Sequence, residues 1–441
     1  MKEKDLLFFI PDDVRFILSS LENAGFEAFV VGGCVRDAIR QVPPKDWDVA
    51  TSATPSQTKA LFARSIDTGI KHGTITVLLG RNSYEVTTYR IDGEYLDSRR
   101  PESVTFSRKI DEDLSRRDFT MNAIAYNPSR GFVDPFYGRD DIDKGIIRCV
   151  GDATCRFSED ALRMLRAIRF AGVLGFSVDE SALNAITQLQ ENLSNISAER
   201  IREELGKLLC GAYPQALMLL ENTKLLTPVL RGYEYVGDLC SVIPQITACP
   251  PDEAMRLTLF LCNAFAIDCA TDATSLPPSI SAVSLDSKCM AMSRVAGILR
   301  DLRYDNKTIK HVTLYVDLLH APLPHDRYGI KKLLRIVPHE IFENLLDLKA
   351  IHNKVLHLSA IEDVRREAQD IISSNECFTL RDLAVSGNDL AQAGIRPGKA
   401  MGNALELLLD AVMRDPSANV KETLINMALC SIPEKPERWF S

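Results

Sequence analysis

The spacing of apolar residues changes once along the chain, and this change limits the folds that are possible. Through about residue 145, short apolar segments alternate with turns and short helical patterns, which is typical of a domain built from strands and helices. From Ser158 to the end, apolar residues recur at helical spacing, interrupted mainly by prolines and glycines. Ser197, for example, predicts the start of a helix that ends at Cys210. We therefore predict an α/β head followed by a long, almost entirely helical portion.

Local signals within the head place three elements. Residues 26–31 form a short apolar strand that runs into Gly32 and Gly33, and residues 34–40 then fit a helix. Residues 54–57 (TPSQ) combine a capping box with proline at the first helical position, which predicts the start of another helix.

A hairpin and a loop follow in the head. Residues 73–79 and 83–90 alternate between apolar and polar side chains on either side of a turn at residues 80–82, which predicts a β-hairpin. Residues 91–109 are polar and charged without a clear period, so we predict a loop there.

The composition indicates a folded protein of the cytoplasm. Of the 441 residues, 46% are hydrophobic and 25% are charged, and the formal net charge is −8, so the overall charge does not favour a nucleic-acid partner. The longest apolar run, residues 257–267, is shorter than the roughly 20 residues that a membrane helix requires, and residues 1–7 do not form a secretory signal. The 11 cysteines contain no Cys-x-x-Cys pair, which argues against a disulfide framework or a zinc ribbon.

Two aspartates separated by one residue form a candidate metal site. Side chains two positions apart on a strand point to the same face, so Asp46 and Asp48 would present their carboxylates side by side. Such oxygen ligands suit one or two Mg²⁺ ions that also hold substrate phosphates. The same pair also occurs at solvated strand ends, so the surrounding sequence decides between the two interpretations.

The surrounding sequence favours a phosphate ligand. Gly32 and Gly33 form a strand-to-helix turn at which backbone N–H groups can approach an anion. Arg36 lies one turn into the following helix and supplies a cation. Taken alone, the glycine pair is equally consistent with an ordinary turn.

Five segments, in order along residues 28–210, resemble the class II tRNA nucleotidyltransferases. These are the CCA-adding enzymes, which are related to bacterial poly(A) polymerases within the polymerase-β-like superfamily. The segments are residues 32–37 (GGCVRD), 46–51 (DWDVAT), 116–123 (RRDFTMNA), 134–138 (DPFYG) and 159–170 (EDALRMLRAIRF). The resemblance implies a polymerase-β-like nucleotidyltransferase head followed by an all-helical neck, body and tail.

The resemblance also implies roles for individual residues. Asp46 and Asp48 match the family's metal-binding pair, and Glu85 matches a third carboxylate. An exposed strand glutamate is the alternative interpretation of Glu85. Further matches imply nucleotide contacts by the following residues: Gly32, Gly33, Arg36, Arg117, Asp118, Asp160, Arg163, Arg166 and Arg169.

One charged pair among these residues can select bases without a nucleic-acid template. Ser158-Glu159-Asp160 predicts the start of a helix through Ala171, on which Asp160 and Arg163 would share a face. An ionised aspartate only accepts hydrogen bonds, and arginine only donates them. Cytosine and adenine present an amino donor beside a ring-nitrogen acceptor, whereas uracil and guanine present a carbonyl beside an N–H, so the pair would leave their polar groups unpaired. An ordinary helical ion pair is the alternative.

Two more arginines continue the same spacing. Each step of three residues rotates about 60° around a helix, so Arg166 and Arg169 should point progressively from the base toward phosphate or RNA. A solvated basic stripe is the alternative interpretation.

The resemblance implies that C and A nucleotides are added to the 3′ end of tRNA from CTP and ATP, with Mg²⁺ as cofactor and pyrophosphate as product. Residues 92–113 match a loop that enzymes adding only the two C residues (CC-only enzymes) lack in part, which disfavours a CC-only role. An A-only enzyme and a poly(A) polymerase stay open, the latter less so because the chain has no basic C-terminal tail. A non-catalytic RNA-binding relative is the alternative of another class. We expect tRNA, ATP and CTP as partners, no membrane association and no obligate protein partner.

The resemblance divides the chain into four parts. They are a head at residues 1–145, a neck at 146–212, a body at 213–375 and a tail at 376–441 that contacts tRNA. Many relatives carry an HD-type phosphohydrolase domain after the neck, and residues 252–335 keep its outline. The expected His-Asp pair falls near residues 261–264 (LCNA), which contain neither His nor Asp, and His320 is followed by Ala321. We therefore expect a degenerate HD-like scaffold without phosphohydrolase activity.

Overall fold

The computed structural model describes residues 10–93, 104–265, 292–352 and 358–431. The described residues form two compact units, one up to Ile309 and the other from Lys310 onward. This boundary lies inside the predicted body at residues 213–375, so the four-part division by function stays a prediction.

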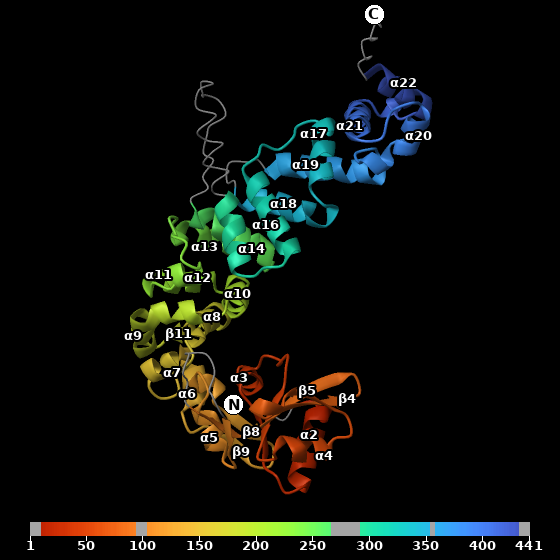
Figure 1. The fold of residues 1–441 in the computed structure, drawn as a ribbon. Helices are drawn as coiled ribbons and strands as arrows, with labels where there is room; N and C mark the ends of the chain where they lie inside the picture. The colour runs from red at the N-terminus through yellow and green to blue at the C-terminus, as the bar shows by residue number, and fades with distance from the viewer. Residues whose placement is uncertain (1–9, 94–103, 266–291, 353–357, 432–441) are drawn as a thin grey trace, which may run out of the picture. The chain divides into compact units, whose positions relative to one another are not determined.

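The head is built on a mixed seven-stranded sheet (Figure 1). The strand order is β3-β4-β5-β2-β1-β8-β9, in which β2 and β5 run parallel and the other neighbours are antiparallel. The strands are β1 (Ala28–Val31), β2 (Asp48–Thr51), β3 (Ser65–Gly69), β4 (Thr74–Leu79), β5 (Asn82–Thr88), β8 (Ala125–Asn127) and β9 (Gly131–Val133). The predicted hairpin is therefore confirmed as β4 and β5.

Short helices accompany this sheet. They are α2 (Asp12–Asn23), α3 (Gly33–Ile39), α4 (Pro55–Leu61), α5 (Ile110–Ser115), the 3₁₀ turn η2 (Thr120–Asn122) and α6 (Gly138–Lys144). The capping box before α4 is confirmed, because the N–H of Thr54 donates to the side chain of Gln57 (2.9 Å) and Thr54 Oγ1 accepts the N–H of Gln57 (3.5 Å). The core beneath the sheet includes Phe29, Val31 and Tyr89.

The loop predicted at residues 91–109 is partly wrong. β6 (Arg90–Asp92) pairs antiparallel with β7 (Val104–Phe106), and residues 94–103 lie outside the described residues. Ile91 and Phe106 are exposed despite being in strands. Because neither strand buries one face, the sequence shows no alternation from which a strand could be predicted.

The chain then becomes helical. The elements of this first helical stretch are β10 (Ile146–Ile147), α7 (Ala153–Glu159), α8 (Leu162–Leu174), β11 (Ser177–Val178), α9 (Glu180–Leu189), α10 (Ala198–Leu209), α11 (Met218–Asn222), α12 (Leu226–Val229), α13 (Leu239–Ala248) and α14 (Glu253–Ala264). Ser197 is the N-cap of α10 and Cys210 its C-cap, as predicted.

The helix predicted from Ser158 through Ala171 is wrong at its start. Asp152 caps an earlier helix by accepting the N–H of Cys155 at 2.8 Å, and α7 ends at Glu159. Asp160 has an extended backbone (φ −140°, ψ 102°) and precedes α8, whose Leu162 N–H it accepts at 3.1 Å. Asp160 is therefore not on the helix that carries Arg163.

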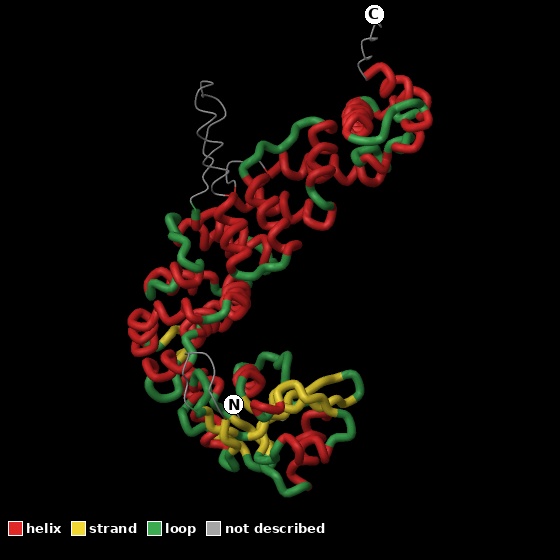
Figure 2. The backbone as a smooth tube through the Cα atoms, viewed as in Figure 1, coloured by secondary structure: helices red, strands yellow, loops and turns green. Residues whose placement is uncertain are grey.

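The second unit is helical throughout its described residues. Its elements include the end of α16 (Asn306–Leu319), α17 (Arg327–Ile336), α18 (His339–His352), α19 (Leu358–Ser373), α20 (Gly387–Gln392), α21 (Lys399–Arg414) and α22 (Lys421–Ser431). The predominance of helix after the head is plain in Figure 2, so the predicted fold class is confirmed. None of the helices in the described ranges has the length and hydrophobicity needed to span a bilayer.

Candidate active site

Three carboxylates gather where β2 and β5 lie side by side. Parallel pairing places Asp48 opposite Glu85. Asp46 lies in the bend before β2 rather than on the strand, which corrects the premise that both aspartates are strand residues. Partial burial raises the pKa of Asp48; the positive charge of Arg117 opposes the rise, and Glu85 and Asp46 add to it. The negative charges of Glu85 and Asp46 are thus close enough to that of Asp48 to repel it.

These carboxylates fit a divalent cation. None of the three has an ion-pair partner within 4.0 Å among the described residues. No group of three or more His, Cys, Asp and Glu side chains in the described ranges is arranged to hold a metal by itself. Asp46 and Asp48 are the residues that would hold such a cation, and Mg²⁺ is usually bound through one or two carboxylates, with water and substrate phosphates as its remaining ligands.

The Gly32-Gly33 turn makes room for an arginine. Gly32 has φ +78°, and a Cβ there would lie 2.8 Å from Nη1 of Arg117. The N–H of Gly32 donates to the carbonyl of Ile124 at 3.1 Å, so this N–H is already used within the protein. A side chain at residue 32 would thus displace Arg117 from the space above the turn.

Arg36 is buried and its hydrogen bonds stay within the protein. Its Nε and Nη2 donate to the two carboxylate oxygens of Asp37 at 2.9 and 3.0 Å, and Nη1 donates to Asn122 Oδ1 at 2.8 Å. This geometry ties α3 to the Arg-Arg-Asp segment. The predicted contact between Arg36 and a phosphate stays a prediction.

A cavity of about 240 Å³ lies beside the Arg-Arg-Asp segment. Its lining residues are Arg116, Arg117, Asp118, Asp160, Arg163, Arg166 and Arg200. Five arginines and two aspartates line the cavity, so guanidinium N–H donors predominate at its surface, which suits an anionic ligand. The structure thus brings together five of the predicted nucleotide-binding residues, whereas Gly32, Gly33, Arg36 and Arg169 do not line this cavity.

The two residues predicted to read the base are held by other partners. Asp160 receives two hydrogen bonds from Arg200, at 2.7 and 3.3 Å. Arg163 donates to Glu159 Oε2 at 2.6 Å and to the carbonyl of Arg116 at 3.2 Å. Asp160 and Arg163 line the same cavity without forming the helical ion pair that was the alternative interpretation.

Buried ion pairs fix the arginines of the Arg-Arg-Asp segment. Asp113, 1% exposed, accepts from Arg116 at 2.6 Å and from Arg117 at 3.2 Å. Asp118 accepts from Arg166 at 2.7 and 3.0 Å. Burial raises the pKa of Asp118, but the charge of Arg166 and hydrogen bonds outweigh burial, and the pKa lies at about 2. Asp118 therefore stays ionised at neutral pH.

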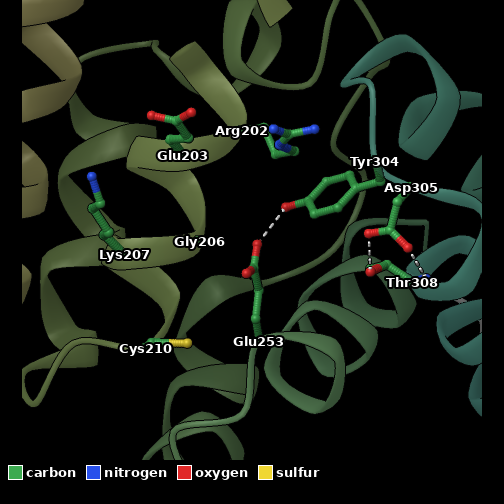
Figure 3. Close-up of a pocket in the computed structure, with 9 residues that line it drawn as sticks. All are labelled: Arg202, Glu203, Gly206, Lys207, Cys210, Glu253, Tyr304, Asp305 and Thr308. Atoms are coloured by element: carbon green, nitrogen blue, oxygen red, sulfur yellow. Dashed lines mark hydrogen bonds between the residues drawn. The ribbon is translucent and has the colours of Figure 1, made fainter. Parts of the chain in front are cut away.

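A larger cavity, of about 640 Å³, adjoins a face of α10 other than the one that carries Arg200 (Figure 3). Its charged lining residues are Arg202, Lys207, Glu203, Glu253 and Asp305. With two cations against three carboxylates, this cavity lacks the excess positive charge that a triphosphate requires. The smaller cavity is the better candidate for the nucleotide because its charge, not its volume, fits the ligand.

Comparisons with known proteins agree with this geometry. Residues 28–148 match the family model "Poly A polymerase head domain", residues 175–236 match "Probable RNA and SrmB- binding site of polymerase A", and residues 279–428 match "tRNA nucleotidyltransferase domain 2 putative". The CCA-adding enzyme of Lactiplantibacillus plantarum is 37% identical over 416 residues, which cover 93% of this chain and 94% of that protein.

The chain belongs to the CCA-adding enzyme family. A second CCA-adding enzyme, from Lactobacillus delbrueckii subsp. bulgaricus, is 38% identical over 397 residues, covering 90% of this chain and 92% of the relative. The crystal structure of the Bacillus stearothermophilus CCA-adding enzyme in complex with CTP has a TM-score of 0.76 at 30% identity and covers 95% of this chain and 98% of its own. As a member of this family, the chain is a nucleotidyltransferase, and CCA-adding enzymes depend on a divalent metal ion.

Sequence reasoning missed two residues that hold Asp160 and Arg163, the pair predicted to read the base. Glu159 lies four positions before Arg163, a spacing that predicts an ion pair, so this contact could have been found. Arg200 follows Asp160 by 40 residues. No local pattern connects these two residues, because their contact depends on how α10 packs against α8.

Proposed function

We propose that this chain adds C and A nucleotides to the 3′ end of tRNA from CTP and ATP, releasing pyrophosphate, with no nucleic acid as template. One observation carries the proposal: an arginine-rich cavity holds Asp160 and Arg163 together with Arg117, whose charge also acts on Asp48 of the carboxylate group. The 37% sequence identity to a CCA-adding enzyme, over 93% of the chain, supports the proposal.

In this proposal the carboxylates hold the metal and the arginines hold the nucleotide. Asp46 and Asp48 are the ligands of Mg²⁺, with Glu85 as a third carboxylate nearby. When bound, Mg²⁺ neutralises charge on the triphosphate and favours ionisation of the attacking hydroxyl. Arg117 and Arg166 orient the triphosphate nucleotide by charge-assisted hydrogen bonds.

Base selection is assigned to Asp160 and Arg163. The carboxylate of Asp160, fixed by Arg200, accepts from the amino group of cytosine or adenine. The guanidinium of Arg163, fixed by Glu159, donates to the ring nitrogen beside that amino group. Uracil and guanine would place a carbonyl against the carboxylate and an N–H against the guanidinium, so both polar contacts would be lost.

The selection can be tested with Arg163→Ala. We expect the ratio of kcat/KM for UTP to that for CTP to rise by about 10- to 100-fold, since one or two hydrogen bonds of ~1–1.5 kcal/mol each no longer discriminate. Steady-state incorporation into tRNA lacking its CCA end measures this ratio. Arg202→Ala, which removes the same group from the other cavity, should keep the wild-type ratio. An unchanged ratio in Arg163→Ala would contradict the assignment.

The alternatives have less support. A-only addition and poly(A) synthesis would both fit the catalytic head, but the relatives that match nearly the whole chain are CCA-adding enzymes. A non-catalytic RNA-binding role does not account for Asp46, Asp48 and Glu85 staying together at the edge of β2 and β5.

The remaining parts of the chain support this reaction in our proposal. Residues 213–375 form a body in which residues 252–335 serve as a degenerate HD-like scaffold, and residues 376–441 contact the tRNA body. At the expected catalytic positions of the HD-like region, Asn263 accepts a hydrogen bond from Tyr235, and His320 packs edge-to-face against His352. A cytoplasmic location completes the proposal, because the proposed substrates, tRNA, CTP and ATP, are found there.

A further inference from the structure

A buried glutamate on α10 contacts two arginines of α8. Glu204 is 4% exposed. Its Oε2 lies 2.7 Å from Nε of Arg169, and its Oε1 lies 3.5 Å from Nη1 of Arg166. Glu204 follows Arg200 by one helical turn, so both side chains project from α10 toward the nucleotide cavity and α8.

Arg169 depends on this carboxylate. Burial lowers the pKa of Arg169, and the neighbouring charge of Arg166 lowers it further, while Glu204 opposes both effects. Among the described residues, Glu204 is the ion-pair partner of Arg169, and no other carboxylate lies within salt-bridge distance of it. The guanidinium also lies over the ring of Phe170, 3.5 Å from its centroid. These contacts place Arg169 outside the lining of the cavity.

Arg166 is held differently. Asp118 binds its Nε and Nη2, and Arg166 lines the cavity. Arg166 and Arg169 lie three positions apart on α8, but only Arg166 lines the cavity. Glu204 contacts both guanidinium groups, and Arg166 lines the cavity, so only the carboxylate of Glu204 separates the guanidinium of Arg169 from the cavity lining.

An additional guanidinium in the cavity would change which bases fit. A guanidinium only donates hydrogen bonds, and the carbonyl oxygens of uracil and guanine only accept them. We propose that Glu204 is a specificity-determining positioning residue: by binding Arg169 it keeps a second donor out of the base-reading cavity, so that uracil and guanine stay rejected. This inference rests on the proposed function, because it presupposes selection of C and A.

The test is Glu204→Gln, with incorporation of each nucleotide measured on tRNA lacking its CCA end. The ratio of kcat/KM for UTP to that for CTP, and the same ratio for GTP to ATP, should rise about tenfold, the effect of one added hydrogen bond of ordinary strength. kcat for CTP should change much less. The matched control is Glu203→Gln, the same change one residue earlier, at a side chain that lines the other cavity (Figure 3); its ratios should equal the wild type.

A double substitution separates this role from a merely structural one. If Arg169 causes the relaxed selection, Glu204→Gln with Arg169→Met should restore the wild-type ratios, because the intruding donor is gone. A structural role would lower overall activity and the Tm without changing the ratios. Wild-type ratios in a folded Glu204→Gln, or relaxed ratios in the double variant, would overturn the inference.

If Glu204→Gln does not fold, Glu204→Asp decides the matter. The shorter carboxylate keeps its charge but binds Arg169 more loosely, so the ratios should rise by a smaller factor; no rise would overturn the inference. Failure of the proposed function looks different, because the wild-type protein would then not incorporate C and A into tRNA at all.

Discussion

At the scale of single residues, most charged side chains of the candidate active site are paired with an opposite charge. Asp113 holds Arg116 and Arg117, Asp118 holds Arg166, and Arg200 holds Asp160. Only the carboxylates near the β2 and β5 edge have no such partner within the described ranges, and we assign those to the metal. Replacing one of these arginines would leave its carboxylate partner buried and unpaired. The resulting loss of stability is larger than the stability that an exposed ion pair contributes.

The Asp118–Arg166 pair predicts how stability depends on pH. The pKa of Asp118 is lowered in the folded state, from 3.8 to about 2, so the pair contributes about 2 kcal/mol that is fully present above pH 4. This contribution is lost as the pH falls from about 4 through about 2, because the unfolded chain binds the proton first. Urea unfolding at several pH values should therefore show a steeper loss of stability below pH 4 for wild type than for Asp118→Asn. Identical pH profiles would contradict the ion pair.

Short motifs suffice to group some of the site residues. Motifs a few residues long grouped Asp46 with Asp48 and Asp160 with Arg163, and the structure brings the members of each pair together; their roles stay predictions. Glu204 could not be identified in this way, because a glutamate in an amphipathic helix normally faces solvent, and its burial results from the packing of α10 on α8.

At the scale of elements, a glycine accounts for one of the family-like segments. Asp134 accepts the N–H groups of Gly138 and Arg139 at 2.7 and 3.0 Å and so fixes the start of α6. A Cβ on Gly138 would lie 2.1 Å from the carbonyl oxygen of Thr120, in the turn that follows the Arg-Arg-Asp residues. The glycine thus lets α6 pack directly against the backbone that follows the Arg-Arg-Asp residues.

Gly138→Ala should therefore destabilise the protein by roughly 2–4 kcal/mol, since backbone atoms must move to relieve the overlap. Gly402→Ala is the matched control, because Gly402 lies in α21 with no atom within 4 Å of an added Cβ. That change should be neutral or stabilise by up to about 1 kcal/mol, as alanine favours helix. Thermal unfolding of both variants measures the difference; equal effects would contradict the packing described.

Elements were predicted correctly where the sequence carries a local signal. The capping box at Thr54 and the alternation in β4 and β5 are examples. The break between α7 and α8 was missed because Ser158 and Asp160 resemble a helix start, whereas the cap that acts is Asp152. β6 and β7 were missed because strands that pair without burying a face leave no periodic pattern.

At the scale of the whole molecule, net charge is a poor guide to the ligand. The chain carries −8 overall, yet the candidate nucleotide cavity is lined by five arginines and two aspartates. Electrostatic attraction of a bound phosphate acts over about 8 Å at physiological salt, so the local arrangement decides. The overall negative charge should disfavour indiscriminate binding of polyanions and leave recognition to this local site.

The most direct test of the account compares wild type with Asp46→Ala on tRNA lacking its CCA end, with CTP and ATP supplied separately and together with Mg²⁺. We predict that wild type adds two C residues with CTP alone and completes CCA when ATP is present. Asp46→Ala should reduce incorporation by at least about a thousandfold, because the metal ligand is lost, while its Tm stays within a few degrees of wild type. Near-normal incorporation of C by folded Asp46→Ala, or failure of wild type to add C, would contradict the account.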